Sequence, residues 1–142
     1  MTSFPTDPNA VTVERMNDHF TKYLLKDGVV LHRFTAAHDA HFHSHPFNMW
    51  SDVLTTGYWE EVIVPLGGGL WGIQRFDRHP GTSHHIERGT IHRLGGFLED
   101  APECWTLIHP YGEREPWHFY KLDDCGRLLR NEPGRPHVWQ FV

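Results

Sequence analysis

From residue 29 onward the chain consists of short apolar or alternating segments, separated by Gly, Pro, Asn and Asp. Alternation with a period of two is typical of strands with one buried face, and closely spaced turn residues limit each segment to the length of a strand. The expected strands are 29–35, 41–45, 49–55, 58–65, 70–77, 84–87, 90–95, 103–109, 117–121 and 137–141. This pattern predicts an all-β sandwich or barrel.

Three glycine-containing segments are expected to connect these strands as turns, so that consecutive strands form hairpins. They are Thr55–Gly57, Leu66–Gly69 and Asp123–Gly126. A different pattern precedes the strands: in residues 12–26, apolar side chains recur at intervals of three and four, and Gly28 follows as a possible helix end. The apolar positions are Val13, Met16, Phe20, Tyr23 and Leu24. We therefore expect one N-terminal helix at about 12–26 that packs outside a barrel at about 29–142.

Composition limits the class of protein. A length of 142 residues predicts a single domain, 1–142. With 13 basic and 18 acidic side chains and no basic run, the chain has no electrostatic footprint for nucleic acid. No apolar stretch reaches the about 18–20 residues of a membrane span, and the first residues do not resemble a signal peptide. We expect a cytoplasmic protein in which Cys104, as a buried thiol, and Cys125 are both reduced.

Histidine is the most informative residue type, with 13 in the chain. His43 and His45 are two residues apart, so on a strand they point to the same face and can bind one ion together. A third ligand has to come from elsewhere in the chain. The alternative interpretation is a solvated polar strand face that also includes His41.

Several segments resemble, in order, the motifs of a family of small single-domain bacterial and phage cupins. They are Leu31–Phe34, His43–Asn48, Gly57–Glu60, His92–Arg93, Trp105–Leu107 and Trp117-x-Phe119, and the match covers residues 30–120. In that family the corresponding patterns resemble His-Asp-His-Pro-Trp, Gly-Gly-Tyr-x-Glu, His-Arg, Trp-Thr-Leu and Trp-Gly-Phe. The resemblance implies a cupin-type double-stranded β-helix, or jelly-roll barrel, and places His92 as the third metal ligand.

The chain departs from the usual cupin pattern at the glutamate ligand, because Met49 and Trp50 occupy the positions where it is expected. The resemblance places Glu60 as the replacement, and hairpin pairing is expected to bring it beside the His43 strand. Glu61, on the opposite face, His41 or water remain alternatives for completing the coordination. Tyr58 shares the face of Glu60, so both are candidate catalytic residues.

Other polar residues receive weaker assignments. His41 is expected to support the ligands from behind, and His84 and His85 to lie at the barrel mouth or face water. Arg93 is expected to form an ion pair with a neighbouring strand. Arg33 and Arg75 are candidates for binding a substrate carboxylate, because a guanidinium group matches a carboxylate with two parallel hydrogen bonds.

These residues predict one divalent metal ion, with Fe(II) favoured and Mn, Ni or Zn as alternatives. The favoured function is a metal-dependent oxygenase, dioxygenase-like, that acts on a small molecule. A metal-assisted isomerase or epimerase and a non-catalytic ligand-binding cupin are the alternatives. A homodimer is expected, with the terminal strand as a place for pairing.

Overall fold

The computed structural model describes residues 11–37, 39–132 and 134–142. In these ranges the chain consists of strands, connecting loops and one short 3-10 turn, η1 (Lys26–Gly28). The strands are β1 (Thr12–Asn17), β2 (Phe20–Leu24), β3 (Val30–Phe34), β4 (Phe42–His43), β5 (Asn48–Val53), β6 (Tyr58–Gly67), β7 (Leu70–Arg78), β8 (Ser83–Ile86), β9 (Ile91–Phe97), β10 (Cys104–Tyr111), β11 (Phe119–Leu122), β12 (Leu128–Glu132) and β13 (Arg135–Phe141). The all-β prediction is confirmed.

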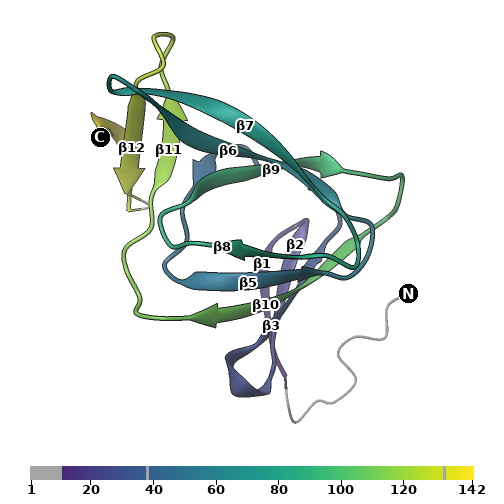
Figure 1. Cartoon of the computed structure of the whole chain (residues 1–142). Helices are drawn as coiled ribbons and strands as arrows, with labels where there is room; N and C mark the ends of the chain where they lie inside the picture. The colour runs from purple at the N-terminus through teal and green to yellow at the C-terminus, as the bar shows by residue number, and fades with distance from the viewer. Residues whose placement is uncertain (1–10, 38, 133) are drawn as a thin grey trace.

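The strands form two antiparallel sheets. One sheet has the order β1-β2-β3-β10-β5-β8 and the other has the order β13-β12-β11-β4-β9-β6-β7. In Figure 1, β6, β7 and β9 lie above β5, β8 and β10, as two layers of a barrel. Many neighbours within each sheet are distant in sequence, as in a jelly roll, and this interleaving brings His43 and His92 onto adjacent strands.

Buried apolar side chains from both sheets hold the two layers together. One cluster joins Val53 and Cys104 from the six-stranded sheet to Tyr58 and Leu94 from the seven-stranded sheet. Cys104 is fully buried, as predicted, and both cysteines are free thiols. The two sheets therefore share one interior at the height of β5, β6, β9 and β10.

The predicted N-terminal helix is wrong. Residues Thr12–Asn17 and Phe20–Leu24 form a hairpin, and β2 extends the six-stranded sheet by pairing with β3. The Asn17 side chain accepts a hydrogen bond from the backbone N–H of His19, which closes the turn, and Phe20 stacks on Phe34 with ring centroids 4.5 Å apart. Pairing with the edge of β3 satisfies backbone groups and partly buries Phe20, and this tertiary gain overrides a weak helical pattern.

The other segment predictions are largely confirmed, with two exceptions. Leu66–Gly69 and Asp123–Gly126 do connect hairpin partners, β6 with β7 and β11 with β12, but β12 itself was not predicted. Thr55–Gly57 connects β5 to β6, which belong to different sheets, so this turn does not form a hairpin. Thr55–Gly57 instead carries the chain from the six-stranded sheet to the seven-stranded sheet.

A β-bulge at Gly95 sets the register between β6 and β9. Trp59 pairs with Gly96 and Glu60 pairs with Leu94, so Gly95 is the extra residue. The Trp59 ring lies directly over this glycine, because a Cβ atom built on Gly95 would be 2.0 Å from Cζ3 of Trp59. Because Gly95 has no side chain, the Trp59 ring can cover the bulge. The residue after Trp59 is Glu60, which contacts His92.

Substituting Gly95→Ala is expected to lower the free energy of unfolding by about 1–3 kcal/mol, the usual cost of forcing an extra methyl group into a packed site. Chemical denaturation measures this change. Gly134→Ala serves as the control, because a Cβ atom there meets nothing within 4 Å. Equal stability of the two variants would contradict the packing of Trp59 on Gly95.

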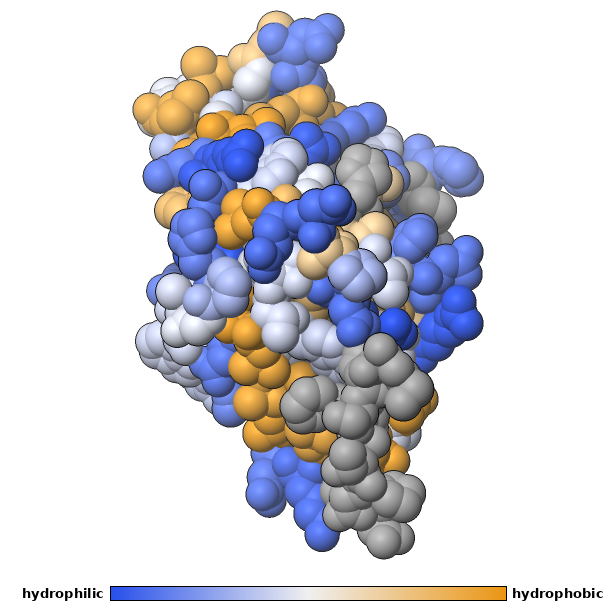
Figure 2. Space-filling model, turned by 90° about the vertical axis from the view of Figure 1, so that its right-hand side faces the viewer, coloured by the Kyte–Doolittle hydropathy of each residue, from blue (hydrophilic) through white to orange (hydrophobic). Residues whose placement is uncertain are grey.

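Exposed apolar side chains gather near the β6–β7 turn and on the terminal strand. Leu66, Leu70, Val138 and Phe141 are all exposed. Figure 2 shows apolar atoms at the top of the molecule, the end at which Figure 1 places the tip of the β6–β7 hairpin. Strand β13 is an edge of its sheet and offers unpaired backbone groups along one side. The homodimer expected through this strand stays a prediction.

In the part of the chain that the structure describes, no helix has both the length and the apolar character that crossing a membrane requires.

Candidate metal centre

Strand pairing places His43 opposite His92. The short strand β4 lies between β11 and β9, and His43 is the residue of β4 that pairs with His92 of β9. Opposite residues of an antiparallel pair project to the same side of the sheet, so the two imidazoles meet there. Their ring centroids are 4.9 Å apart.

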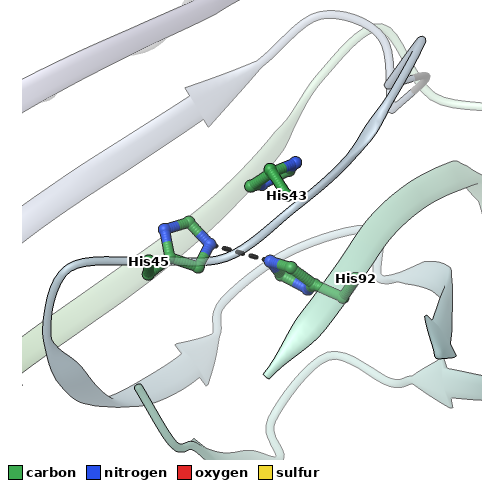
Figure 3. A group of neighbouring side chains, drawn as sticks. All are labelled: His43, His45 and His92. Atoms are coloured by element: carbon green, nitrogen blue, oxygen red, sulfur yellow. Dashed lines mark hydrogen bonds between the residues drawn. The ribbon is translucent and has the colours of Figure 1, made fainter. Parts of the chain in front are cut away.

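His45 completes the group from the segment just after β4. Its ring centroid is 5.0 Å from that of His43 and 4.9 Å from that of His92. Figure 3 shows the rings of His45 and His92 turned toward each other, with His43 beside them. One nitrogen from each histidine lies within 4.8 Å of the others, a group that could hold one metal ion. The ligand trio predicted from the sequence is thus brought together.

The other ring nitrogens of His43 and His92 have protein partners. Nδ1 of His43 lies 3.2 Å from the His41 carbonyl oxygen, and Nδ1 of His92 lies 2.7 Å from a Glu60 carboxylate oxygen. An Nδ1–H that donates to these acceptors leaves Nε2 of each ring with its lone pair, which is the form that binds a metal. His41 therefore supports His43 through its backbone carbonyl.

Nε2 of His45 and Nε2 of His92 are only 2.7 Å apart. Two imidazole lone pairs repel at this distance unless a proton or a cation is shared between them. Three imidazole nitrogens suit Fe(II), Zn(II) and Ni(II). Mn(II) is a harder ion and binds imidazole less strongly. The donor set therefore fits a divalent transition metal.

Glu60 is buried behind His92. One carboxylate oxygen accepts the hydrogen bond from His92 and the other accepts hydrogen bonds from Arg78, with N···O distances of 2.8 and 2.7 Å. Burial alone raises the pKa of Glu60, but the hydrogen bonds from His92 and Arg78 and the positive charge beside it outweigh burial and lower the pKa to about 2. Glu60 is thus an ionised carboxylate that fixes the orientation of the His92 ring.

The position of Glu60 differs in one respect from the sequence-based expectation. Strand β6 pairs with β7 and β9, so Glu60 is a neighbour of the His92 strand and not of the His43 strand. Both of its oxygens already have partners, and direct coordination by Glu60 stays a prediction. Glu61 points to the opposite face, as expected, and accepts a hydrogen bond of 2.9 Å from Arg93. The expected ion pair of Arg93 with a neighbouring strand is thus formed.

Burial keeps His43 and His45 neutral. It lowers the pKa of His43 to about 4 and the pKa of His45 well below its ordinary value, and the neighbouring His92 adds to both effects. A histidine ligand has to be neutral to donate its lone pair. The lone pairs of His43 and His45 are therefore available to a metal ion at neutral pH.

Stability of the metal-free protein is expected to fall between pH 7 and pH 5. Burial also lowers the pKa of His32, to about 3, so the unfolded chain, in which histidine has a pKa of about 6.5, binds protons in this range that the folded chain does not. His32 alone should lower the free energy of unfolding by about 2 kcal/mol over this range, and the lowered pKa values of His43 and His45 should add to the fall. Urea titrations in the presence of a chelator at both pH values test this, and the variant His32→Leu should show a smaller decrease. A stability that rises on acidification would contradict it.

The arginines proposed for substrate binding are engaged elsewhere. Arg33 pairs with Glu103 at 2.6 Å, and Arg75 pairs with Asp77 at 3.1 Å and lies over the Trp59 ring. Neither side chain lines the cavity described next. Arg78 is the functional residue that the sequence did not single out, since its role depends on the β6–β7 register.

A cavity of about 400 Å³ lies between the two sheets, and His43, His45 and His92 line it. Tyr58 lines it too, with its hydroxyl 3.5 Å from Nε2 of the half-buried His84. Burial raises the pKa of Tyr58, so the phenol keeps its proton and can donate a hydrogen bond. Glu60 is 1% exposed and does not line the cavity.

By sequence, no family model and no curated protein matches the chain. Structure comparison gives matches of low identity. An Fe(II) form of HppE aligns with a TM-score of 0.57 and 10% identity over 74% of this chain and 58% of that one. Oxalate decarboxylase from Bacillus subtilis, described with Mn(II) centres, gives 0.54 and 13% over 71% and 28%. A 7S globulin from Momordica charantia gives 0.55 and 9% over 81% and 36%.

These three proteins share the cupin fold, but their names include enzymes and a globulin, so the fold does not decide the reaction. The chain spans less than two thirds of the length of each. At 9–13% identity, what agrees is the fold alone. The chain therefore has the cupin fold, with a group of three histidines suited to one metal ion at its central cavity.

Proposed function

We propose that this protein is a metal-dependent enzyme, an oxygenase that uses Fe(II) and acts on a small molecule. The observation that carries the proposal is that the three histidines both converge on one point and line the cavity. An ion held there would have protein ligands on one side and the cavity on the other. Fe(II) with open coordination positions supplies the oxygen chemistry of such enzymes.

The chain's own residues have separate tasks in this proposal. His43, His45 and His92 hold the metal, and Glu60 positions His92 through its Nδ1 proton. Tyr58 faces the cavity with its proton in place, so its hydroxyl donates a hydrogen bond to an oxygen atom of the substrate. The aromatic and aliphatic walls exclude water from the reacting groups.

Oxygen consumption after anaerobic reconstitution with Fe(II) tests the proposal. The protein is purified without a nickel column, loaded with Fe(II), Mn(II) or Zn(II), and supplied with a panel of small ring compounds. Oxygen uptake is expected from the Fe(II) form of the wild type and from neither the Zn(II) form nor the variant His92→Ala. Turnover by the Zn(II) form without oxygen would replace the oxygenase with Lewis-acid chemistry.

A further inference from the structure

The walls of the cavity are largely apolar and come from both sheets. Phe20 and Phe34, which stack on each other, belong to the six-stranded sheet. On the opposite side, Trp117 and Phe119 meet edge to face with ring centroids 5.1 Å apart. Aliphatic side chains such as Ile108 also line the cavity. A ligand here contacts rings on two sides.

The described residues that line the cavity include no lysine and no arginine. Residues 1–10, 38 and 133, which lie outside the described part, contain none in sequence either. Among the described residues, the one acidic side chain that lines the cavity, Asp39, accepts a hydrogen bond from the backbone N–H of Leu94.

Charged ligands need a countercharge when they leave water. Burying an ion without a partner is strongly unfavourable, and a metal at the three histidines could neutralise only the group that binds it. A second anionic group on the same ligand would lie against phenylalanine, tryptophan and isoleucine. Dicarboxylates and similar polyanions are therefore poorly matched to this cavity.

Hydroxyl groups line the cavity in addition to the histidines. Ser51 and Thr106 are buried and line the cavity, as does the Tyr58 hydroxyl. Such hydroxyls both donate and accept hydrogen bonds, so they match a hydroxyl or carbonyl group of a ligand. A volume of about 400 Å³ is near the lower limit for small-molecule pockets, which sets the size of the ligand at one small ring system.

We propose that the substrate is a small aromatic compound with a single polar group, bound with its ring between the Phe20–Phe34 wall and the Trp117–Phe119 wall and its polar group toward the histidines. This inference rests on the proposed function for the reaction, but the binding itself requires no metal. Offset and edge-to-face contacts with four rings favour an aromatic ligand over an aliphatic one of equal size. The N-terminal hairpin contributes Phe20 and thus forms part of the binding site.

Calorimetric titration of the metal-free wild type with 2-naphthol, the saturated alcohol decahydro-2-naphthol and the dianion succinate tests the proposal. We expect 2-naphthol to bind in a 1:1 ratio, with an affinity at least about tenfold higher than that of the saturated alcohol and with no measurable binding of succinate. Succinate binding as tightly as 2-naphthol, or the saturated alcohol binding equally well, would overturn the substrate class.

Matched tryptophan variants locate the binding. Trp117→Ala removes one wall and should weaken 2-naphthol at least about tenfold, as expected for the loss of a large aromatic contact. Trp50→Ala is the control, since Trp50 is exposed and does not line the cavity. Unchanged affinity in Trp117→Ala would place the ligand elsewhere. Naphthol binding by a protein that takes up no metal would leave the substrate class standing and remove the proposed oxygenase, so the two proposals fail separately.

Discussion

Replacing His43, His45 or His92 by alanine is expected to reduce metal content from about one equivalent to near zero, because two imidazoles alone hold a divalent ion weakly. Each histidine supplies one of the three converging nitrogens, and no other described side chain belongs to the group. Plasma mass spectrometry on protein purified without a nickel column, before and after reconstitution with Fe(II), measures the effect.

His137→Ala is the control for these variants. His137 lies on the edge strand β13 with an exposed side chain and takes no part in the group of three. Its metal content should equal that of the wild type. Retention of one equivalent by a His43→Ala/His92→Ala double variant would place the metal elsewhere.

Loss of the Glu60 carboxylate is expected to damage both stability and metal affinity. Glu60→Ala leaves the Arg78 guanidinium without its buried partner, and breaking a buried ion pair in this way costs about 3–5 kcal/mol of unfolding free energy. Glu60→Gln keeps the volume but weakens the acceptor for His92, so the metal affinity should fall by about 10–100-fold. Denaturant titration and competition with a chelator measure the two effects.

Glu61→Gln is the matched control, because Glu61 is the next residue of β6, points to the other face and pairs with the partly exposed Arg93. Its metal affinity should equal that of the wild type. If Glu60→Gln also left the metal affinity unchanged, Glu60 would have no role in orienting His92.

The ligand trio could be predicted from the sequence because each histidine carries a local signal. The spacing of His43 and His45 predicted a shared face, although His45 lies just after β4, and His92 occupies the place of the second cupin motif. Their convergence depends on β4 pairing with β9, which follows from the fold that the motifs indicated. Strands β3 to β11 and β13 were likewise predictable, because alternation and turn residues mark them.

The remaining features depend on contacts between segments far apart in sequence. The β1–β2 hairpin has a helical spacing of apolar residues, and only the free edge of β3 makes it a strand pair. Arg78 reaches Glu60 through the β6–β7 register, and Glu60 reaches His92 through the β6–β9 register beside the bulge at Gly95. Neither register is encoded in a motif, so the charge network behind the histidines could not be predicted.

The cavity was also beyond prediction from the sequence. Its aromatic walls come from β2, β3 and the segment around β11, and the sequence does not say which face of each strand turns inward. Without the strand orientation, Arg33 and Arg75 were predicted as substrate-binding residues on their chemistry alone. Both carry suitable chemistry, but their partners hold them away from the cavity.

Crystals of the metal-loaded protein, measured at the absorption edge of the metal, would test the central claim most directly. We expect one anomalous peak at bonding distance, about 2.0–2.3 Å, from a ring nitrogen of each of His43, His45 and His92, with Glu60 still hydrogen-bonded to His92. A peak bound by other residues, or no peak in crystals of protein reconstituted with metal, would contradict a metal centre built from these three histidines.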